Sequence, residues 1–386
     1  MPTVRISRKG ASRIASGHPW IFSSDVLDRG QAAAGDAVTV VGPSGGALGT
    51  AHYSEASQIS LRMLSERVEA IDRAFFRQRI AAAEAHRKRV VADSEAYRLV
   101  HGEADELPGL VIDRYGDYFT LQTLDQGMDR AKSDIVGVLE ELFAPRGIVE
   151  RNDVAIRKRE ALPLVSGVVA GEAPETVALR MNGLKLHADL LHGQKTGIFL
   201  DQRENYLAAA RYGRGRALDC FTSTGGFALH LAARCESVEA IDSGEAALRV
   251  AKMNCEANGI ANVELREADV FDLLGGYASA RRRFDLVVLD PPAFAKSRQA
   301  LDAAVRGYGE INRRALQLLD PGGVLVTCSC SHHLSEAELL EVVAKASLDT
   351  GRKLRVLERR MQAQDHPVLL TVPETLYLKC LILEVI

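Results

Sequence analysis

Residues 216–232, RALDCFTSTGGFALHLA, open the pattern that predicts the fold of the larger part of this 386-residue chain. Ala217-Leu218-Asp219 is predicted to be a strand, and the apolar spacing of 226–234 predicts a helix. The same alternation continues through strands and helices expected at 238–241, 244–257, 263–265, 285–289, 300–319, 324–327 and 335–348. It predicts a doubly wound α/β sheet, whose ligands bind at the carboxyl ends of the strands.

The loop after the first of these strands, residues 219–226, is rich in small residues. Small residues let a backbone turn tightly and approach a ligand, and the N-terminus of the following helix offers free N–H donors. The loop is not G-x-G-x-x-G, so the pyrophosphate cradle of a dinucleotide site is incomplete. Taken alone, Thr224-Gly225-Gly226 fits a plain turn equally well.

Four successive strand ends carry an acidic residue: Asp219, Asp242, Asp269 and Asp290. Asp242 is placed where a carboxylate can hold both hydroxyls of a ribose, and Asp269-Val270 is placed to contact an adenine edge. Any single one of these acids could instead cap a helix or form a turn. The series as a whole favours a cofactor with an adenosine and no pyrophosphate, which S-adenosylmethionine fits best.

The segments around these acids resemble the class I S-adenosylmethionine-dependent methyltransferases, and in particular the 23S rRNA cytosine-5 methyltransferases of the large ribosomal subunit. The likeness extends over nearly the whole chain. The matching segments are GHPWIF (17–22), KTGIFLDQR (195–203), the loop through Phe227, DPPAFAKS (290–297), SCS (329–331), DHP (365–367) and Pro373-Glu374.

The resemblance implies three domains. Short β-like runs between Gly-rich turns make residues 1–69 a small β-barrel, similar to the RNA-binding PUA domain. Residues 70–175 form a central α+β domain, with helices near 70–93 and 129–143 and a β-hairpin or meander through 97–121, followed by a polar stretch. Residues 176–386 form the methyltransferase domain.

The resemblance and the strand-end positions together imply a set of cofactor-binding residues. These are Thr196, Phe199, Asp201, Gln202, Arg203, Asp219, Phe221, Thr224, Gly225, Asp242, Ser243, Asp269, Val270 and Asp290. In the family, the segment 195–203 lies against the methionine end of the cofactor.

Cys330 is the candidate nucleophile, because carbon 5 of cytosine is too weakly nucleophilic to attack a sulfonium methyl directly. A thiolate that adds to carbon 6 makes carbon 5 reactive, and this requires an exposed cysteine of low pKa near the cofactor. The resemblance singles out Cys330 in Ser-Cys-Ser, while Cys328 is better explained as strand packing. A buried structural cysteine is an open alternative for Cys330. A metal site formed with Cys328, His332 and His333 is another.

The resemblance also implies contacts with the target base. Asp290 or the Pro291 carbonyl would meet cytosine N3 or N4, and Pro292, Phe294 and Lys296 would line the substrate site. Some RNA cytosine-5 methyltransferases carry a second cysteine for product release where this chain has Ala293. Glu374 resembles the glutamate base of uracil-5 enzymes, and a solvated turn carboxylate is the alternative reading.

Two other functions fit parts of the same pattern. Amino-methylating enzymes carry an aromatic residue directly after Asp-Pro-Pro, whereas here Ala293 intervenes before Phe294. Methylation of guanine or an exocyclic amine would also leave Cys330 without a role. A non-catalytic RNA-binding factor that holds the cofactor structurally is the other alternative, and the intact set of strand-end acids together with the cysteine argues against it. A small-molecule substrate would leave the N-terminal domain idle.

Composition sets broader limits. The net charge of −3 does not by itself indicate a nucleic-acid binder, and the basic clusters at 77–89, 157–159 and 281–283 read as solvated faces or as a stripe for phosphates. Six cysteines at irregular spacings favour reduced thiols and a cytoplasmic location. No apolar run is long enough to predict a membrane span. The resemblance implies RNA as the partner, namely 23S rRNA or a large-subunit precursor, and makes a homodimer plausible.

Overall fold

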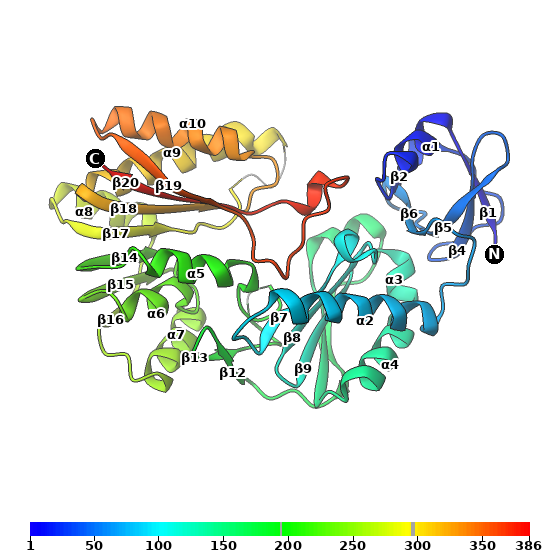
Figure 1. Ribbon diagram of the computed structural model, residues 1–386, viewed down its shortest axis with the longest axis horizontal. Coiled ribbons are helices and arrows are strands. Elements are labelled where there is room, and N and C mark those ends of the chain that lie inside the picture. Colours follow the sequence, from blue (N-terminus) through cyan, green and yellow to red (C-terminus); the bar gives the residue numbers. More distant parts are fainter. Residues whose placement is uncertain (194, 295–297) are drawn as a thin grey trace. The chain divides into compact units, whose positions relative to one another are not determined.

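The computed structural model describes residues 1–193, 195–294 and 298–386, and the chain divides into two compact units (Figure 1). Unit 1 comprises residues 1–181, 188–198 and 364–375, and unit 2 comprises 182–187, 199–363 and 376–386. The chain crosses between the units at 181/182, 187/188, 198/199, 363/364 and 375/376. The first crossing follows β12 (Val177–Met181), and the second falls near the end of β13 (Leu184–Ala188). The three-domain division expected from the sequence remains a prediction.

The N-terminal part of unit 1 is a six-stranded sheet in the order β2-β6-β5-β4-β1-β3. Its elements are β1 (Thr3–Ile6), α1 (Arg8–Ala15), β2 (Trp20–Phe22), β3 (Val26–Asp28), β4 (Ala37–Val41), β5 (Ala47–Tyr53) and β6 (Ile59–Ser65). Alternate residues of β4 are buried, so Val38 and Val40 join Val4, Ile6 and Ile21 in a small apolar core. The expected small β domain is confirmed.

The remainder of unit 1 is a five-stranded sheet in the order β11-β10-β9-β8-β7. Its strands are β7 (Ala96–His101), β8 (Leu110–Tyr115), β9 (Tyr118–Thr123), β10 (Gly147–Asn152) and β11 (Val165–Gly171), and its helices are α2 (Arg73–Val90), α3 (Gln126–Arg130) and α4 (Lys132–Phe143). The expected helices and the hairpin are confirmed. The stretch expected to be only polar contains β10 and β11, which pair antiparallel.

Unit 2 contains a seven-stranded sheet in the order β16-β15-β14-β17-β18-β20-β19. Its strands are β14 (Arg216–Cys220), β15 (Ser237–Asp242), β16 (Val263–Glu267), β17 (Phe284–Leu289), β18 (Leu319–Ser329), β19 (Leu354–Arg360) and β20 (Lys379–Val385). The first five are parallel, while β20 runs antiparallel to both β18 and β19. The strand order reverses between β14 and β17, which is where such sheets bind ligands.

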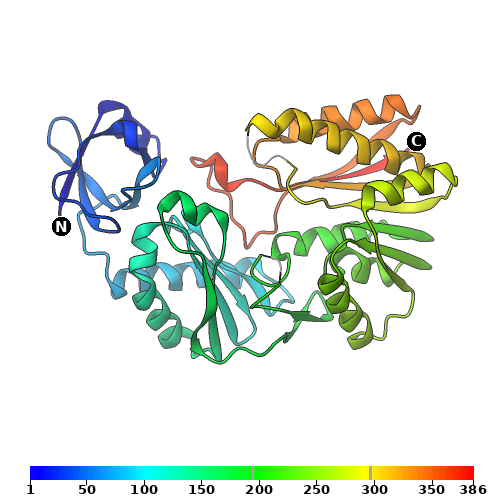
Figure 2. The same cartoon turned by 180° about the vertical axis from the view of Figure 1, so that it is seen from behind.

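Helices cover both faces of this sheet, as Figures 1 and 2 show. Those on one face are α5 (Arg203–Ala210), α6 (Gly226–Ala232) and α7 (Glu245–Ala257), and those on the other are α8 (Val270–Ser279), α9 (Leu301–Gln317) and α10 (Glu336–Asp349). The predicted doubly wound fold is confirmed. Among the described residues, none of the helices has the length and apolar character needed to span a bilayer.

Candidate active site

The loop that follows β14 turns sharply. Phe221 and Ser223 adopt left-handed backbone conformations with φ of +63° and +50°, and Gly225 follows with φ of +89°. Such conformations are uncommon for residues other than glycine and concentrate at functional sites. Gly226 packs under a tyrosine, because a Cβ there would lie 2.4 Å from the Tyr206 ring. The predicted cofactor loop therefore turns tightly at the carboxyl end of β14, where its backbone groups can approach a ligand.

The buried carboxylate of Asp219 is hydrogen-bonded to this loop. Its Oδ2 accepts hydrogen bonds from the Thr222 hydroxyl (2.5 Å) and from the backbone N–H of Ala228 (3.0 Å). Its Oδ1 is buried and has no hydrogen-bond partner among the described residues. Burial raises the pKa of Asp219 to about 7. Asp219 therefore holds the loop with one oxygen and leaves the other available to a donor on a ligand.

Asp242 joins the end of β15 to the same loop. Its Oδ2 accepts from the backbone N–H of Ser223 (2.9 Å), and its Oδ1 accepts from the backbone N–H of Gly244 (2.8 Å). A carboxylate oxygen can accept a second hydrogen bond, so both oxygens remain able to bind the two hydroxyls of a ribose. Ser243 beside it is exposed.

Asp269 is the N-cap of α8, and its side chain accepts from the backbone N–H of Asp272 (3.1 Å). The sequence allowed any one of the four strand-end acids to be a helix cap instead of a ligand contact, and the carboxylate of Asp269 does cap a helix. The side chain of Val270 is buried in the core under the sheet. The predicted contact of these two residues with an adenine remains a prediction.

The segment 199–203 lies against the end of β17. Gln202 is buried, and its Nε2 donates to Oδ1 of Asp290 (2.9 Å). Asp201 is also buried, and its Oδ2 accepts from the hydroxyl of Tyr377 (2.7 Å). The buried Arg203 begins α5. The structure thus brings together residues that are almost 90 positions apart in the sequence.

Tyr206 is buried and is acted on by the charges of three of these carboxylates. Its hydroxyl donates to the Phe199 carbonyl (3.2 Å). Burial raises the pKa of Tyr206 well above its ordinary value, and the charges of Asp290, Asp201 and Asp219 raise it further. Three carboxylates acting on one buried ring give this end of the sheet a negative potential, which favours a cationic ligand.

Thr196 and Glu374 belong to unit 1 and not to the unit that carries the other candidates. The hydroxyl of the buried Thr196 donates to Oδ2 of Asp113 (2.5 Å) and lies 3.0 Å from the Tyr115 hydroxyl. Glu374 is about half exposed, and its Oε2 lies 3.2 Å from Nε2 of His18. The predicted roles of Thr196 and Glu374 remain predictions.

Cys330 directly follows β18 and is half-buried. Cys328, two residues earlier, is fully buried and lies opposite Cys380 on β20, as strand packing predicts. Burial raises the pKa of Cys328 well above that of an ordinary thiol. The described residues include no group of three or more His, Cys, Asp and Glu side chains arranged to hold a metal ion. Of these two cysteines, Cys330 is the more accessible at a strand end.

Sequence reasoning missed two residues beside Cys330. The Lys379 ammonium donates to the Ser331 carbonyl (2.7 Å). The Tyr308 hydroxyl lies 2.9 Å from the Ser329 hydroxyl and 3.1 Å from that of Ser331. The two serines of Ser-Cys-Ser are thus held from α9 and β20. A lysine at the start of the apolar run 380–383 was the only sequence signal for this arrangement.

The residues after Asp290 differ in how far they are buried. Pro291 is buried and Pro292 is exposed. The Phe294 ring lies 4.7 Å from the Tyr308 ring and 5.9 Å from the Phe271 ring, and so packs against the core. Lys296 falls outside the described residues. Contacts of these four residues with a substrate remain predictions.

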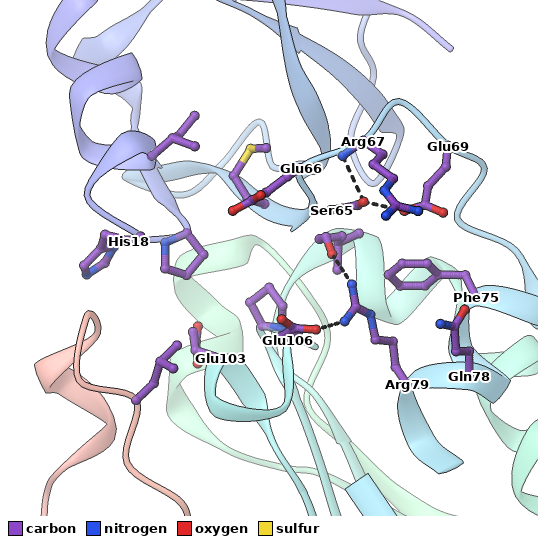
Figure 3. A pocket seen from close by; sticks show the side chains of 17 residues that line it. His18, Ser65, Glu66, Arg67, Glu69, Phe75, Gln78, Arg79, Glu103 and Glu106 are labelled. Carbon is purple, nitrogen blue, oxygen red and sulfur yellow. Dashed lines mark hydrogen bonds and ion pairs between the residues drawn. The ribbon is translucent and has the colours of Figure 1, made fainter. Parts of the chain in front are cut away.

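A separate cavity of about 450 Å³ lies in unit 1 (Figure 3). His18, Glu66, Phe75, Arg79 and Glu103 are among the residues that line it. Most of its charged groups already have partners: Arg79 pairs with a neighbouring glutamate, and Glu103 accepts from the Trp20 indole (2.8 Å). It contains none of the strand-end acids, and the candidate active site is therefore the end of the unit 2 sheet.

Comparison with known families agrees with this geometry. Residues 150–381 match the family described as S-adenosylmethionine-dependent methyltransferases, and residues 4–66 match the PUA-like domain. A candidate SAM-dependent methyltransferase from Streptococcus mutans has the same fold, with a TM-score of 0.84 at 22% identity and full coverage of both chains. A second solved structure, of a methyltransferase complexed with SAH, gives a TM-score of 0.85 at 21% identity over both full chains. The fold and the site define an S-adenosylmethionine-dependent methyltransferase.

Curated relatives narrow this class. A protein of Shewanella amazonensis is 44% identical over 377 residues, covering 95% of each chain, and one of Klebsiella pneumoniae is 42% identical over 371 residues, covering 94% of this chain and 93% of its own. Both are named Ribosomal RNA large subunit methyltransferase I. The chain belongs to this family.

The described residues fit the cofactor of this class. S-adenosylmethionine carries a positively charged amino group and a sulfonium, which suit the carboxylates around Tyr206 and the open oxygen of Asp219. Asp242 offers two acceptors to the ribose. The cofactor supplies the methyl group, while the chain binds it and holds the acceptor.

Asp219 predicts a pH signature for cofactor binding. Its pKa is raised to about 7, and a cationic ligand should favour the ionised form, so binding near pH 6.5 should release a fraction of a proton. Calorimetry of S-adenosylmethionine binding in two buffers of different ionisation enthalpy measures this release, which Asp219→Asn should abolish.

The same raised pKa predicts a stability effect without ligand. The folded state binds the Asp219 proton more tightly than the unfolded state, so its contribution to stability falls as pH rises from about 4 to 7. Asp219→Asn should therefore melt several degrees higher than the wild type at pH 8 and not at pH 4. Equal melting differences at the two pH values would show that Asp219 is not a raised-pKa group.

Proposed function

We propose that this protein methylates carbon 5 of a cytosine in large-subunit ribosomal RNA and that Cys330 is the nucleophile. The relatives are named for methylation of the ribosomal RNA of the large subunit, and the PUA-like match at 4–66 supports an RNA partner. The observation that carries the proposal is the half-buried Cys330 at the carboxyl end of β18, the strand next to β17 and its Asp290. Methylation of a nitrogen would need no such thiol.

The proposed reaction proceeds through a covalent bond between Cys330 and the cytosine. The Cys330 thiolate would form a bond to carbon 6, and the electrons of the carbon 5–carbon 6 double bond would move to carbon 5. Carbon 5 would then take the methyl group from the sulfonium, whose broken bond leaves its electron pair on sulfur, so that the neutral thioether S-adenosylhomocysteine is the leaving group. A base then removes the carbon 5 proton, the double bond reforms, and the bond to sulfur breaks to return the thiolate. Asp290 is proposed to hold cytosine N3 or N4, in reach of the nucleophile.

The base that removes the carbon 5 proton is proposed to be Glu374. Some enzymes use a second cysteine where this chain has Ala293, and Glu374 is put forward because it resembles the glutamate base of uracil-5 enzymes. Nε2 of His18 lies 3.2 Å from Oε2 of Glu374.

The product nucleoside tests this proposal. Large-subunit ribosomal RNA made by transcription would be incubated with the protein and methyl-labelled S-adenosylmethionine, digested, and analysed by chromatography and mass spectrometry. We expect the label in 5-methylcytidine. Label in a guanosine or in an N-methylated base would overturn the proposal, as would labelling of free nucleosides at the same rate as RNA.

A further inference from the structure

Lys379 is a buried charged residue that the mechanism above does not use. It begins β20, pairs in register with Ser329 at the end of β18, and is 6% exposed. Its Nζ donates to the carbonyl oxygens of Ser331 (2.7 Å) and Tyr377 (2.9 Å). Because Ser331 follows Cys330 directly, this hydrogen bond restrains the backbone next to the thiol.

The groups that act on this ammonium come from every element packed against it. Cys330, after β18, favours the charged form most strongly, followed by Glu338 and Glu336 on α10. Tyr377 contributes its carbonyl, and the ring of His332 lies 5.6 Å from the Tyr377 ring. Burial opposes these charges and lowers the pKa of Lys379 to about 8. The two carbonyl hydrogen bonds and the nearby negative charges offset part of the cost of burying this ammonium.

We propose that Lys379 is a positioning residue, whose ammonium stabilises the thiolate of Cys330 and whose bond to the Ser331 carbonyl fixes the backbone that carries it. This inference rests on the proposed role of Cys330 as nucleophile. A neighbouring cation lowers the pKa of a thiol, because it favours the charged form. The thiol proton leaves to solvent, and Lys379 keeps its own protons during the reaction.

The pH dependence of Cys330 reactivity depends on the charge of the Cys330 thiol and on that of the Lys379 ammonium. With Lys379 charged, Cys330 should ionise below the usual thiol pKa of about 8.5. As pH rises through about 8, Lys379 loses its proton and its stabilisation of the thiolate fades. Both effects leave a window near neutral pH in which the thiolate and the ammonium coexist.

The test measures the reactivity of Cys330 in the full-length protein. Alkylation by iodoacetamide is followed against pH, and the Cys330 peptide is quantified by mass spectrometry. Lys379→Met removes the charge and keeps the length, while Lys379→Arg keeps the charge and is the matched control. We expect the midpoint of alkylation to rise by about one pH unit in Lys379→Met, with an about tenfold slower reaction at pH 7, and to stay close to the wild type in Lys379→Arg.

Methylation gives a second readout that a merely structural role would not move. Lys379→Met should methylate RNA about tenfold more slowly at pH 7, recover toward the wild-type rate at pH 9, and bind S-adenosylmethionine with unchanged affinity. An unchanged alkylation midpoint in folded Lys379→Met overturns the inference. A nitrogen-methylated product would overturn the proposed function while leaving this midpoint shift intact.

The reciprocal variant covers the case in which Lys379→Met does not fold. Coupling between two charges is mutual, so removing the thiolate in Cys330→Ala should lower the pKa of Lys379 further. Carbon-13 labelling of the lysine ε-carbons allows this pKa to be followed by NMR titration. A Lys379 pKa equal in wild type and Cys330→Ala would overturn the inference.

Discussion

Cys330→Ala should lower the rate of RNA methylation by about 10³-fold or more, while S-adenosylmethionine binds as it does to the wild type. The variant removes the sulfur that makes carbon 5 of cytosine reactive, and no neighbouring thiol can replace it. Cys328 is fully buried on the preceding strand and faces Cys380, with a pKa raised by burial. Single-turnover rates and calorimetric affinities separate the chemical step from cofactor binding.

Cys328→Ala is the matched control for this variant. It removes a sulfur two residues away, within β18, and should cost stability through a small cavity without changing the methylation rate per folded molecule. If Cys330→Ala kept its activity, or if Cys328→Ala lost as much, Cys330 would not be the nucleophile.

Asp242→Ala should weaken the binding of S-adenosylmethionine by about 100-fold. The carboxylate accepts from the backbone N–H groups of Ser223 and Gly244, so its loss releases the cofactor loop and also removes the two acceptors proposed for the ribose. Hydrogen bonds to a charged group contribute about 1.5–3 kcal/mol each, so losing one ribose contact and the loop restraint accounts for this factor.

Glu245→Ala is the control for the loss of charge. Glu245 lies three residues further on, is largely exposed, and pairs with Arg249 across one turn of α7. Its removal changes the net charge equally and should leave cofactor affinity within about twofold, because exposed ion pairs contribute little. Unchanged affinity in Asp242→Ala would refute the placement of the ribose, whereas a similar loss in both variants would indicate a general electrostatic effect.

The sequence predicted the parallel part of the unit 2 sheet from short runs that contain apolar residues, most of them followed by a helical pattern. The helix α8 between β16 and β17 was not predicted. Asp219, Asp242 and Asp290 could be placed from this alternation alone, since parallel strands deliver their carboxyl ends to one edge. Asp269 shows the limit of this reasoning, because a strand-end acid that caps a helix has the same sequence pattern as one that binds a ligand.

The C-terminal strands and their contacts could not be predicted. The run from Lys379 to Val385 lacks the polar alternation of a half-buried strand, and a short apolar run does not distinguish a strand from a buried helix. The position of Lys379 beside Cys330 depends on a register that joins residues 50 positions apart, which no local pattern specifies.

The crossings of the chain between the two units also leave no local signal. Thr196 and Phe199 are three residues apart, yet they belong to different units, and the same holds for Glu374 and Tyr377. The resemblance to the family, and no local pattern, grouped Thr196 and Glu374 with the cofactor and base residues. Their hydrogen-bond partners, Asp113 and His18, lie far from them in the sequence.

RNA containing 5-fluorocytidine provides the most direct test of covalent catalysis by Cys330. Fluorine replaces the carbon 5 proton that the base would remove, so the enzyme cannot be released by elimination. The bond between sulfur and carbon 6 should therefore persist after methyl transfer. We predict a protein–RNA adduct that requires S-adenosylmethionine, survives denaturation, maps by mass spectrometry to the Cys330 peptide, forms in Cys328→Ala and is absent in Cys330→Ala. The absence of any adduct in wild-type protein that methylates the unmodified RNA, or an adduct at another residue, would contradict the account.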